Sequence, residues 1–210
     1  MLKNINCNFQ SELSEIKRQK DCWYLRFKDN KYIYSKNLIL SIPFPQAKKL
    51  TSKFVKTKLF KNKVIMNSSL TVLLMTNKTA IKASSFFTND KVLGWVSKEN
   101  SKKRFKYNKD LWVLQSNFEY GKKHTDNYRN KKKFYTNVLI NKFKKLTKIK
   151  IRKTYFTHIH GWKYSSNSKP LNVQSYWDKK IGLGICGDWF GGPRLENGWL
   201  SAKDLFKKIN

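Results

Sequence analysis

The chain has 210 residues, enough for one domain or two small ones, and its hydrophobic content of 40% excludes disorder as the default state. It contains no run of 18 apolar residues, no visible signal peptide and no CxxC spacing among its three cysteines, so we expect a cytoplasmic chain with free thiols. The net charge is +32, but only six of the 45 basic residues are Arg and the lysines are spread along the whole chain. This distribution favours a lysine-rich composition over specific nucleic-acid binding, which stays open as an alternative.

The first third of the chain predicts strands. Residues 8–16 alternate weakly, and residues 22–27 and 32–34 are rich in β-forming residues on either side of a polar turn, which predicts a hairpin. Residues 37–42 form a continuous apolar run ended by two prolines at 43 and 45. A run that is apolar on both faces is typical of a strand inside a parallel sheet.

The middle of the chain predicts strands and two helices. A helix is expected over residues 46–61, and a second from Thr125 or Asp126 to about residue 148, because their apolar residues recur at helical spacing. Strands are expected at 64–76, 92–97, 111–116 and 148–160.

The last part of the chain is rich in glycine. Residues 165–177 show no periodicity and predict a loop, and residues 181–186 predict a final buried strand. A closing helix is expected over residues 197–209, with its apolar residues facing inward: Trp199, Leu200, Leu205, Phe206 and Ile209.

Two motifs in the sequence are too incomplete to assign a site. Glycines at 182, 184 and 187 match GxGxxG, but no helix and second strand with an acidic residue follow, as the dinucleotide fingerprint requires. His158 and His160 lie on one face of a predicted strand without an obvious third ligand, so we expect no metal site.

Asp188 is a more specific signal. A carboxylate between Gly187 and Trp189, at the end of an apolar strand, is costly to bury without a partner. It is either a cap of the following turn or an acceptor for ligand hydroxyl groups. The expected helix start nearby would add free N–H groups and a dipole that favours negative charge.

Residues 186–189 (CGDW) and 191–201 (GGPRLENGWLS) resemble the C-terminal flavin-binding motif of the flavin amine oxidase superfamily. The resemblance is closest to its renalase-like branch of bacterial FAD-dependent oxidoreductases, whose motif reads roughly GDW, a short glycine loop and RVEGAWLSG. Weaker matches follow the family's order: residues 41–47 (SIPFPQA), Trp95 with Lys102 and Arg104, residues 112–114 (WVL) and residues 160–164 (HGWKY).

The resemblance implies that FAD is the cofactor. It assigns Asp188 to the ribityl chain of FAD, and the backbone N–H groups near Trp199 and Leu200 to the N1/O2 edge of the flavin. The cofactor-binding residues that it implies are Gly187, Asp188, Trp189, Gly198, Trp199 and Leu200. Its candidates for lining the substrate site are His160, Trp162 and Tyr164, and no catalytic base is indicated.

Three departures from the family pattern stand out. Ala202 replaces the last glycine of the motif, and Gly161 replaces the usual Arg. The largest departure is that the family's N-terminal strand–GxGxxG–helix unit, which binds the ADP part of FAD, is missing. The sequence therefore resembles only the C-terminal part of such an enzyme.

The resulting expectation is a mixed α/β fold with an incomplete FAD-binding, Rossmann-type domain. Residues 1–44 and 178–210 would form that domain, and residues 45–177 a substrate domain on a mixed or antiparallel sheet with helices. The implied function is hydride transfer from an amine or a reduced-nicotinamide-like substrate to flavin, and that substrate is the expected partner. The sequence leaves open whether the chain is one half of a split gene, with a separately encoded N-terminal half as a second partner, a truncated product or a remnant. An inactive remnant that acts as a binding module is a further alternative. Specific nucleic-acid binding and membrane attachment are not expected.

Overall fold

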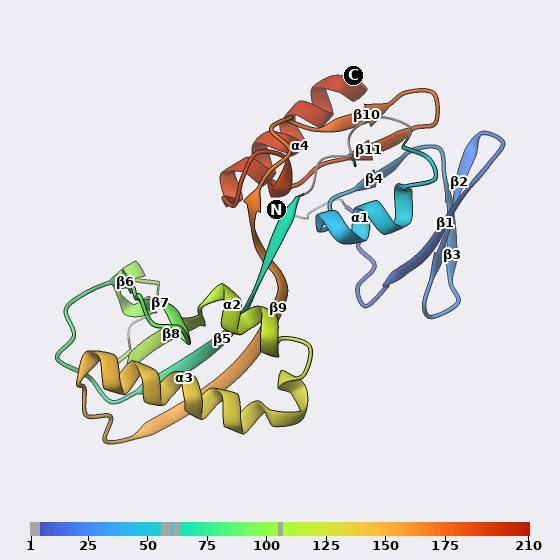
Figure 1. Ribbon diagram of the computed structural model, residues 1–210. Coiled ribbons are helices and arrows are strands. Elements are labelled where there is room, and N and C mark those ends of the chain that lie inside the picture. The colour runs from blue at the N-terminus through green and yellow to red at the C-terminus, as the bar shows by residue number, and fades with distance from the viewer. Residues whose placement is uncertain (1–4, 56–59, 61–63, 105–106) are drawn as a thin grey trace. The chain divides into compact units, whose positions relative to one another are not determined.

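The computed structural model describes residues 5–55, 60, 64–104 and 107–210, and it divides into two compact units (Figure 1). We call Met1–Ile65 with Asn167–Asn210 the flanking unit, and Met66–Ser166 the central unit. The described residues form a mixed α/β fold, as predicted, and contain four α-helices and three sheets. The sequence had suggested divisions after residues 44 and 177, which assign residues 45–65 and 167–177 to the inserted part.

The flanking unit begins with a three-stranded antiparallel sheet of β1 (Leu13–Gln19), β2 (Cys22–Phe27) and β3 (Tyr32–Ser35). The pairing of β2 with β3 confirms the predicted hairpin. Alternation along the strands buries Ile16, Trp23 and Leu25 on one face. The indole Nε1 of Trp23 donates a hydrogen bond of 2.8 Å to the carbonyl oxygen of Ile181, which ties this sheet to the residues before the last strand.

A second sheet in the flanking unit has the order β10 (Tyr176–Asp178), β11 (Leu183–Ile185) and β4 (Leu38–Leu40). Strands β11 and β4 are parallel, as the apolar run at residues 37–42 predicted. Two helices belong to the same unit: α1 (Phe44–Thr51) and α4 (Leu195–Ile209). Pro43 is the N-cap of α1, and Pro45 lies in its first turn, where the fixed φ of proline suits the helix and its missing N–H has no intrahelical partner to lose.

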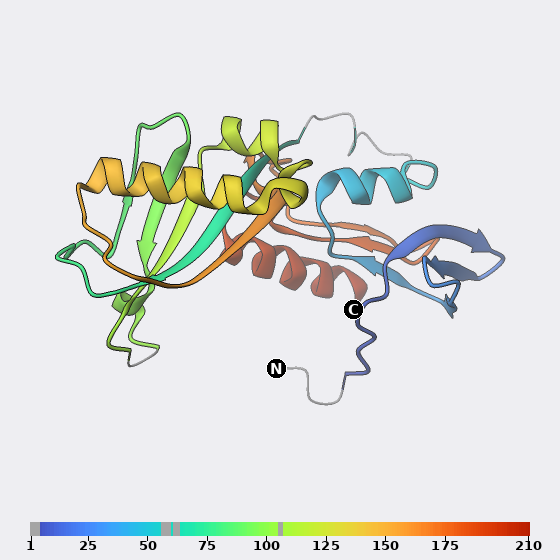
Figure 2. The ribbon, with the colours of Figure 1, turned by 90° about the horizontal axis from the view of Figure 1, so that it is seen from below.

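The central unit contains a five-stranded sheet in the order β6-β7-β8-β5-β9. Helix α3 (Lys132–Thr147) lies along one face of it (Figure 2), and α2 (Phe118–His124) precedes α3. The core forms where side chains from β5 and β8 meet α3, and it includes Leu70, Trp112, Leu139 and Phe143. The strands are β5 (Ile65–Thr76), β6 (Ser85–Phe87), β7 (Leu93–Lys98), β8 (Asp110–Ser116) and β9 (Thr154–Lys169).

Several predicted boundaries were wrong. The helix expected over residues 46–61 ends at Thr51, and part of that range lies outside the described residues. The helix expected from Thr125 or Asp126 is interrupted by a 3₁₀ turn at Tyr128–Lys131, so α3 begins at Lys132. The strand expected over residues 148–160 is instead β9, which begins at Thr154 and continues to Lys169, into the first part of the region predicted as a loop. Strand pairing determines this extent, and pairing cannot be read from local periodicity.

The closing helix also differs from its prediction. It begins at Leu195, two residues before the expected start. Leu205 is buried as predicted, but Trp199 is 60% exposed and Phe206 is 67% exposed. None of the described helices is long and apolar enough to cross a membrane.

Candidate functional site

The candidate site is built where β11 ends in the flanking unit. Cys186 donates its N–H to the carbonyl oxygen of Leu40, which extends the parallel pairing by one residue. Gly187 then donates its N–H to Oγ of Ser201 at 3.0 Å, so the end of the strand is held against α4. Gly187 has φ of +155°, and a Cβ there would lie 2.8 Å from Nε1 of Trp189, so this turn requires glycine.

Asp188 opens a 3₁₀ turn, η4 (Asp188–Phe190), and its carbonyl oxygen accepts hydrogen bonds from Gly191 and Gly192. Burial raises the pKa of the Asp188 carboxyl above its ordinary value, and this rise is only partly opposed by the N–H groups of Trp189 and of Asp188 itself and by the amide of Asn167. Within the described part of the chain, no Lys, Arg or His forms a salt bridge with it. A half-buried carboxylate without a cation is suited to accept hydrogen bonds from a ligand.

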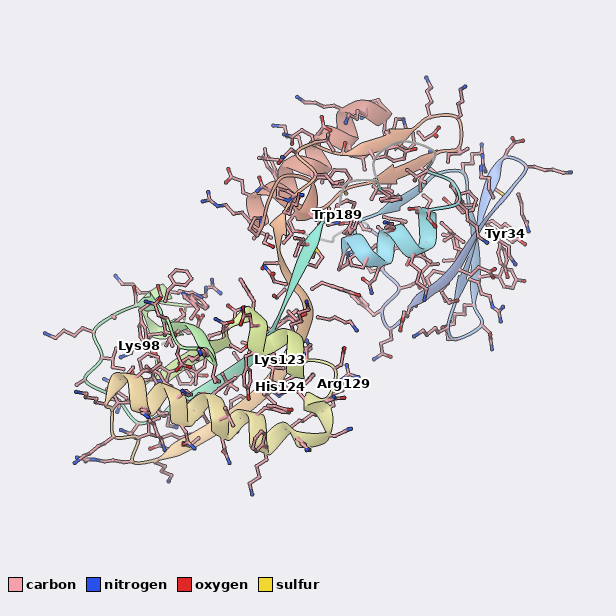
Figure 3. All side chains as sticks on the ribbon, in the orientation of Figure 1. Tyr34, Lys98, Lys123, His124, Arg129 and Trp189 are labelled. Carbon is pink, nitrogen blue, oxygen red and sulfur yellow. The ribbon has the colours of Figure 1, made fainter. Side chains whose placement is uncertain are left out.

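Trp189, labelled in Figure 3, follows this carboxylate in sequence, and its side chain is buried. Its Nε1 donates to the carbonyl oxygen of Ile42 at 3.0 Å, and its ring contacts those of Phe190 and Phe44 at centroid distances of 4.1 and 5.2 Å. The Trp189 side chain therefore packs the end of β11 against the residues that follow β4.

The start of α4 forms the second side of the candidate site. The N-cap residue is Arg194, and no side chain caps the helix N-terminus. A Cβ at Gly198 would lie 3.8 Å from the backbone nitrogen of Asp188, so Gly198 and Asp188 are neighbours. The N–H groups of Trp199 and Leu200 follow the first turn, where intrahelical acceptors exist, so the free N–H groups of this helix belong to earlier residues.

The three candidate substrate-lining residues belong to the central unit. His160, Trp162 and Tyr164 alternate along β9 and so share one face of the strand. The rings of His160 and Trp162 lie 4.5 Å apart, and Trp162 is 51% exposed. Gly161, on the other face, has the ring of Tyr128 against it, since a Cβ there would approach Tyr128 Cε1 to 2.4 Å. The Tyr128 ring therefore occupies the space that a side chain at position 161 would need, which leaves no room there for an Arg.

No group of three or more His, Cys, Asp or Glu side chains that would hold a metal occurs among the residues described. His158 and His160 thus have no third ligand in that part of the chain. The third histidine of the chain, His124, has its Nδ1 3.1 Å from the Tyr135 hydroxyl.

Two sets of polar residues escaped the sequence prediction. Asn167 lies next to Asp188 and is 1% exposed, but it falls in a stretch without periodicity that gave no signal. Lys98 and Asp110 form a salt bridge of 2.9 Å with side chains 15% and 5% exposed. Their only sequence signal was a charge at each edge of a strand, which is common on solvated surfaces.

No family model matches the chain. Among solved structures, its fold is similar to that of a protein assigned as a protoporphyrinogen oxidase from Exiguobacterium sp. 255-15, with a TM-score of 0.68 and 15% identity over 95% of this chain and 46% of that one. A CLA-producing fatty acid isomerase from P. acnes gives a TM-score of 0.57 and 10% identity, with 95% of this chain and 47% of that chain covered.

A triple mutant of putrescine oxidase, made in a redesign of cofactor binding, gives a TM-score of 0.56 and 8% identity over 95% of this chain and 48% of that one. At these identities the similarity shows a shared fold. The chain spans about half the length of each of these proteins.

Proposed function

We propose that the chain is the C-terminal part of an FAD-dependent oxidoreductase of the amine oxidase type, closest to the renalase-like branch. The observation that carries this proposal is the half-buried Asp188, which has no salt-bridge partner in the described chain and lies between the end of a parallel strand and the start of α4. The sequence motif of residues 186–201 and the fold shared with oxidases support it.

The residues present fit the flavin side of FAD. A carboxylate without a cation accepts hydrogen bonds from hydroxyl groups, which the ribityl chain carries. The uncapped N-terminus of α4 supplies positive potential, worth about 1 kcal/mol, toward the negative edge of a reduced flavin. Bound FAD would supply the hydride acceptor for an amine or a reduced-nicotinamide-like substrate. Gly187 and Gly198 allow the backbone to approach the cofactor, and Trp189 keeps the turn packed.

The partner that we propose is an N-terminal FAD-binding half with the strand–GxGxxG–helix unit. In the described chain, no strand pairs with the outer edge of β4, where Ile39 is 51% exposed. Helix α4 also carries an exposed apolar stripe, in which Leu195, Trp199 and Phe206 are 94%, 60% and 67% exposed. The proteins of similar fold are about twice as long as this chain, and their additional length is sufficient for such a half.

The substrate side of the proposed enzyme is the central unit. His160, Trp162 and Tyr164 share one face of β9 and offer two aromatic rings and an imidazole to a small organic substrate. This assignment rests on the resemblance of residues 160–164 to the family motif.

The test is a flavin absorption spectrum of the purified chain, alone and co-expressed with a GxGxxG-containing N-terminal half. The complex is expected to carry flavin, and Asp188→Ala is expected to weaken its binding about tenfold or more, since a charge-assisted hydrogen bond contributes about 1.5–3 kcal/mol. Asp126→Ala, which removes an exposed carboxylate from the central unit, is the matched control. Absence of flavin from both preparations would contradict the proposal, and unchanged affinity in Asp188→Ala would remove the ribityl role.

A further inference from the structure

Asn167 lies near the end of β9 and is 1% exposed. Neither its Oδ1 nor its Nδ2 has a hydrogen-bond partner within the described part of the chain, and both atoms are buried. A buried amide without partners is unfavourable by about 1–3 kcal/mol, so a residue of this kind needs a reason to be present.

The position of Asn167 suggests that reason. The residues that follow it run beside η4, because Leu171 donates its N–H to the carbonyl oxygen of Trp189 at 3.1 Å and Asn172 donates to that of Phe190 at 2.9 Å. The Asn167 amide also interacts with the Asp188 carboxyl, and this interaction opposes part of the rise in pKa that burial causes. Because neither Oδ1 nor Nδ2 of Asn167 forms a hydrogen bond of full geometry within the described residues, both atoms can bind a ligand.

The two groups are chemically complementary. An ionised carboxylate only accepts hydrogen bonds, whereas a carboxamide both donates and accepts them. A ligand hydroxyl needs one acceptor for its proton and one donor for its oxygen. Asp188 and Asn167 together provide both, and a chain of neighbouring hydroxyl groups can use them at two successive positions.

We propose that Asn167 is a further cofactor-binding residue, and that it forms with Asp188 a pair that binds the hydroxyl groups of a polyol chain. This inference rests on the proposed function, in which the polyol is the ribityl chain of FAD. Asp188 accepts the proton of one hydroxyl, and the Asn167 amide donates to the oxygen of the same or the next hydroxyl.

The experiment compares two flavins on the complex with the N-terminal half. FAD carries the ribityl chain, and lumiflavin has the same ring system without it. Asn167→Leu, which keeps the volume of the side chain, is expected to weaken FAD binding about tenfold, the effect of one hydrogen bond of about 1.4 kcal/mol, and to leave lumiflavin binding unchanged. The double variant with Asp188→Ala is expected to lose less than the product of the two single effects, since the residues act on one group. Ser168→Ala, an exposed neighbour, is the control.

Two results would overturn the inference. One is unchanged FAD affinity in Asn167→Leu, and the other is an equal loss for FAD and lumiflavin, which would indicate a packing effect.

A separate measurement covers the case in which wild-type protein binds neither flavin and the proposed function fails. Ribitol is then added to the ligand-free chain while the ¹³C carboxyl signal of Asp188 is followed. A shift in the wild type that is lost in Asn167→Leu supports the hydroxyl-binding pair, and no shift in the wild type overturns it.

Discussion

Asp188 shows how a single carboxylate is affected by its place at the end of β11. Because burial raises its pKa above the ordinary value of 3.8, the folded chain binds a proton more tightly than the unfolded chain does. The free energy of unfolding therefore falls as the pH rises from the ordinary carboxyl value to the raised one. Above the raised pKa, the free energy of unfolding is lowered by the full cost of burying the ionised carboxylate.

We expect Asp188→Asn to remove this pH-dependent loss in the ligand-free chain, because the amide does not ionise. Urea unfolding of the variant and the wild type at several pH values from acid to neutral measures the free energy of unfolding of both. The difference between the variant and the wild type should grow in favour of the variant as the pH rises. A difference that does not change with pH would show that Asp188 is not titrating in a buried environment.

Lys98, labelled in Figure 3, ends β7 and Asp110 begins β8, and the two form the most buried ion pair among the described residues. Asp110 also accepts hydrogen bonds of 2.8 Å from the backbone and the hydroxyl of Thr79, and Lys98 donates to the carbonyl oxygen of Ile81 at 3.0 Å. The pair thus joins β7 and β8 to the segment that follows β5. Its partners come from three elements, so its loss affects how those elements are held together.

At the scale of these elements, we expect Lys98→Met to lower the free energy of unfolding by about 3–5 kcal/mol, because it leaves the Asp110 carboxylate buried without a cation. Lys102→Met is the matched control, since Lys102 pairs with Glu99 at the surface and its loss should change stability by less than about 1 kcal/mol. Urea unfolding followed by tryptophan fluorescence gives both values. Equal effects of the two substitutions would contradict the assignment.

The elements also show which kind of prediction succeeds. The apolar run at residues 37–42 predicted a parallel strand, and β4 pairs in parallel with β11, because a strand covered on both faces needs apolar residues at every position. The weakly periodic residues 165–177 predicted a loop, but β9 continues to Lys169 and β10 follows. Those strands exist because their backbone finds partners far away in the sequence.

At the scale of the whole molecule, the exposed apolar stripe of α4 is the feature that a partner would change most. We expect Trp199→Lys to lower the affinity of the chain for the proposed N-terminal half by about tenfold or more, since an aromatic anchor at an interface contributes about 2 kcal/mol or more. The folding of the isolated chain should change little, because Trp199 is 60% exposed. Co-purification with a titrated partner and urea unfolding measure the two effects. Unchanged affinity would exclude this stripe from the interface.

The sequence by itself determined the local features: the hairpin, the parallel strand, the turn at Gly187 and the carboxylate of Asp188 at its end. Each depends on residues that are neighbours in the chain, such as an apolar run or a glycine in a tight turn. Only the tertiary structure decided that Asn167 lies beside Asp188, that α4 begins at Leu195 and that Lys98 pairs with Asp110. These features depend on contacts between segments that are distant in the sequence, so no local sequence pattern predicts them.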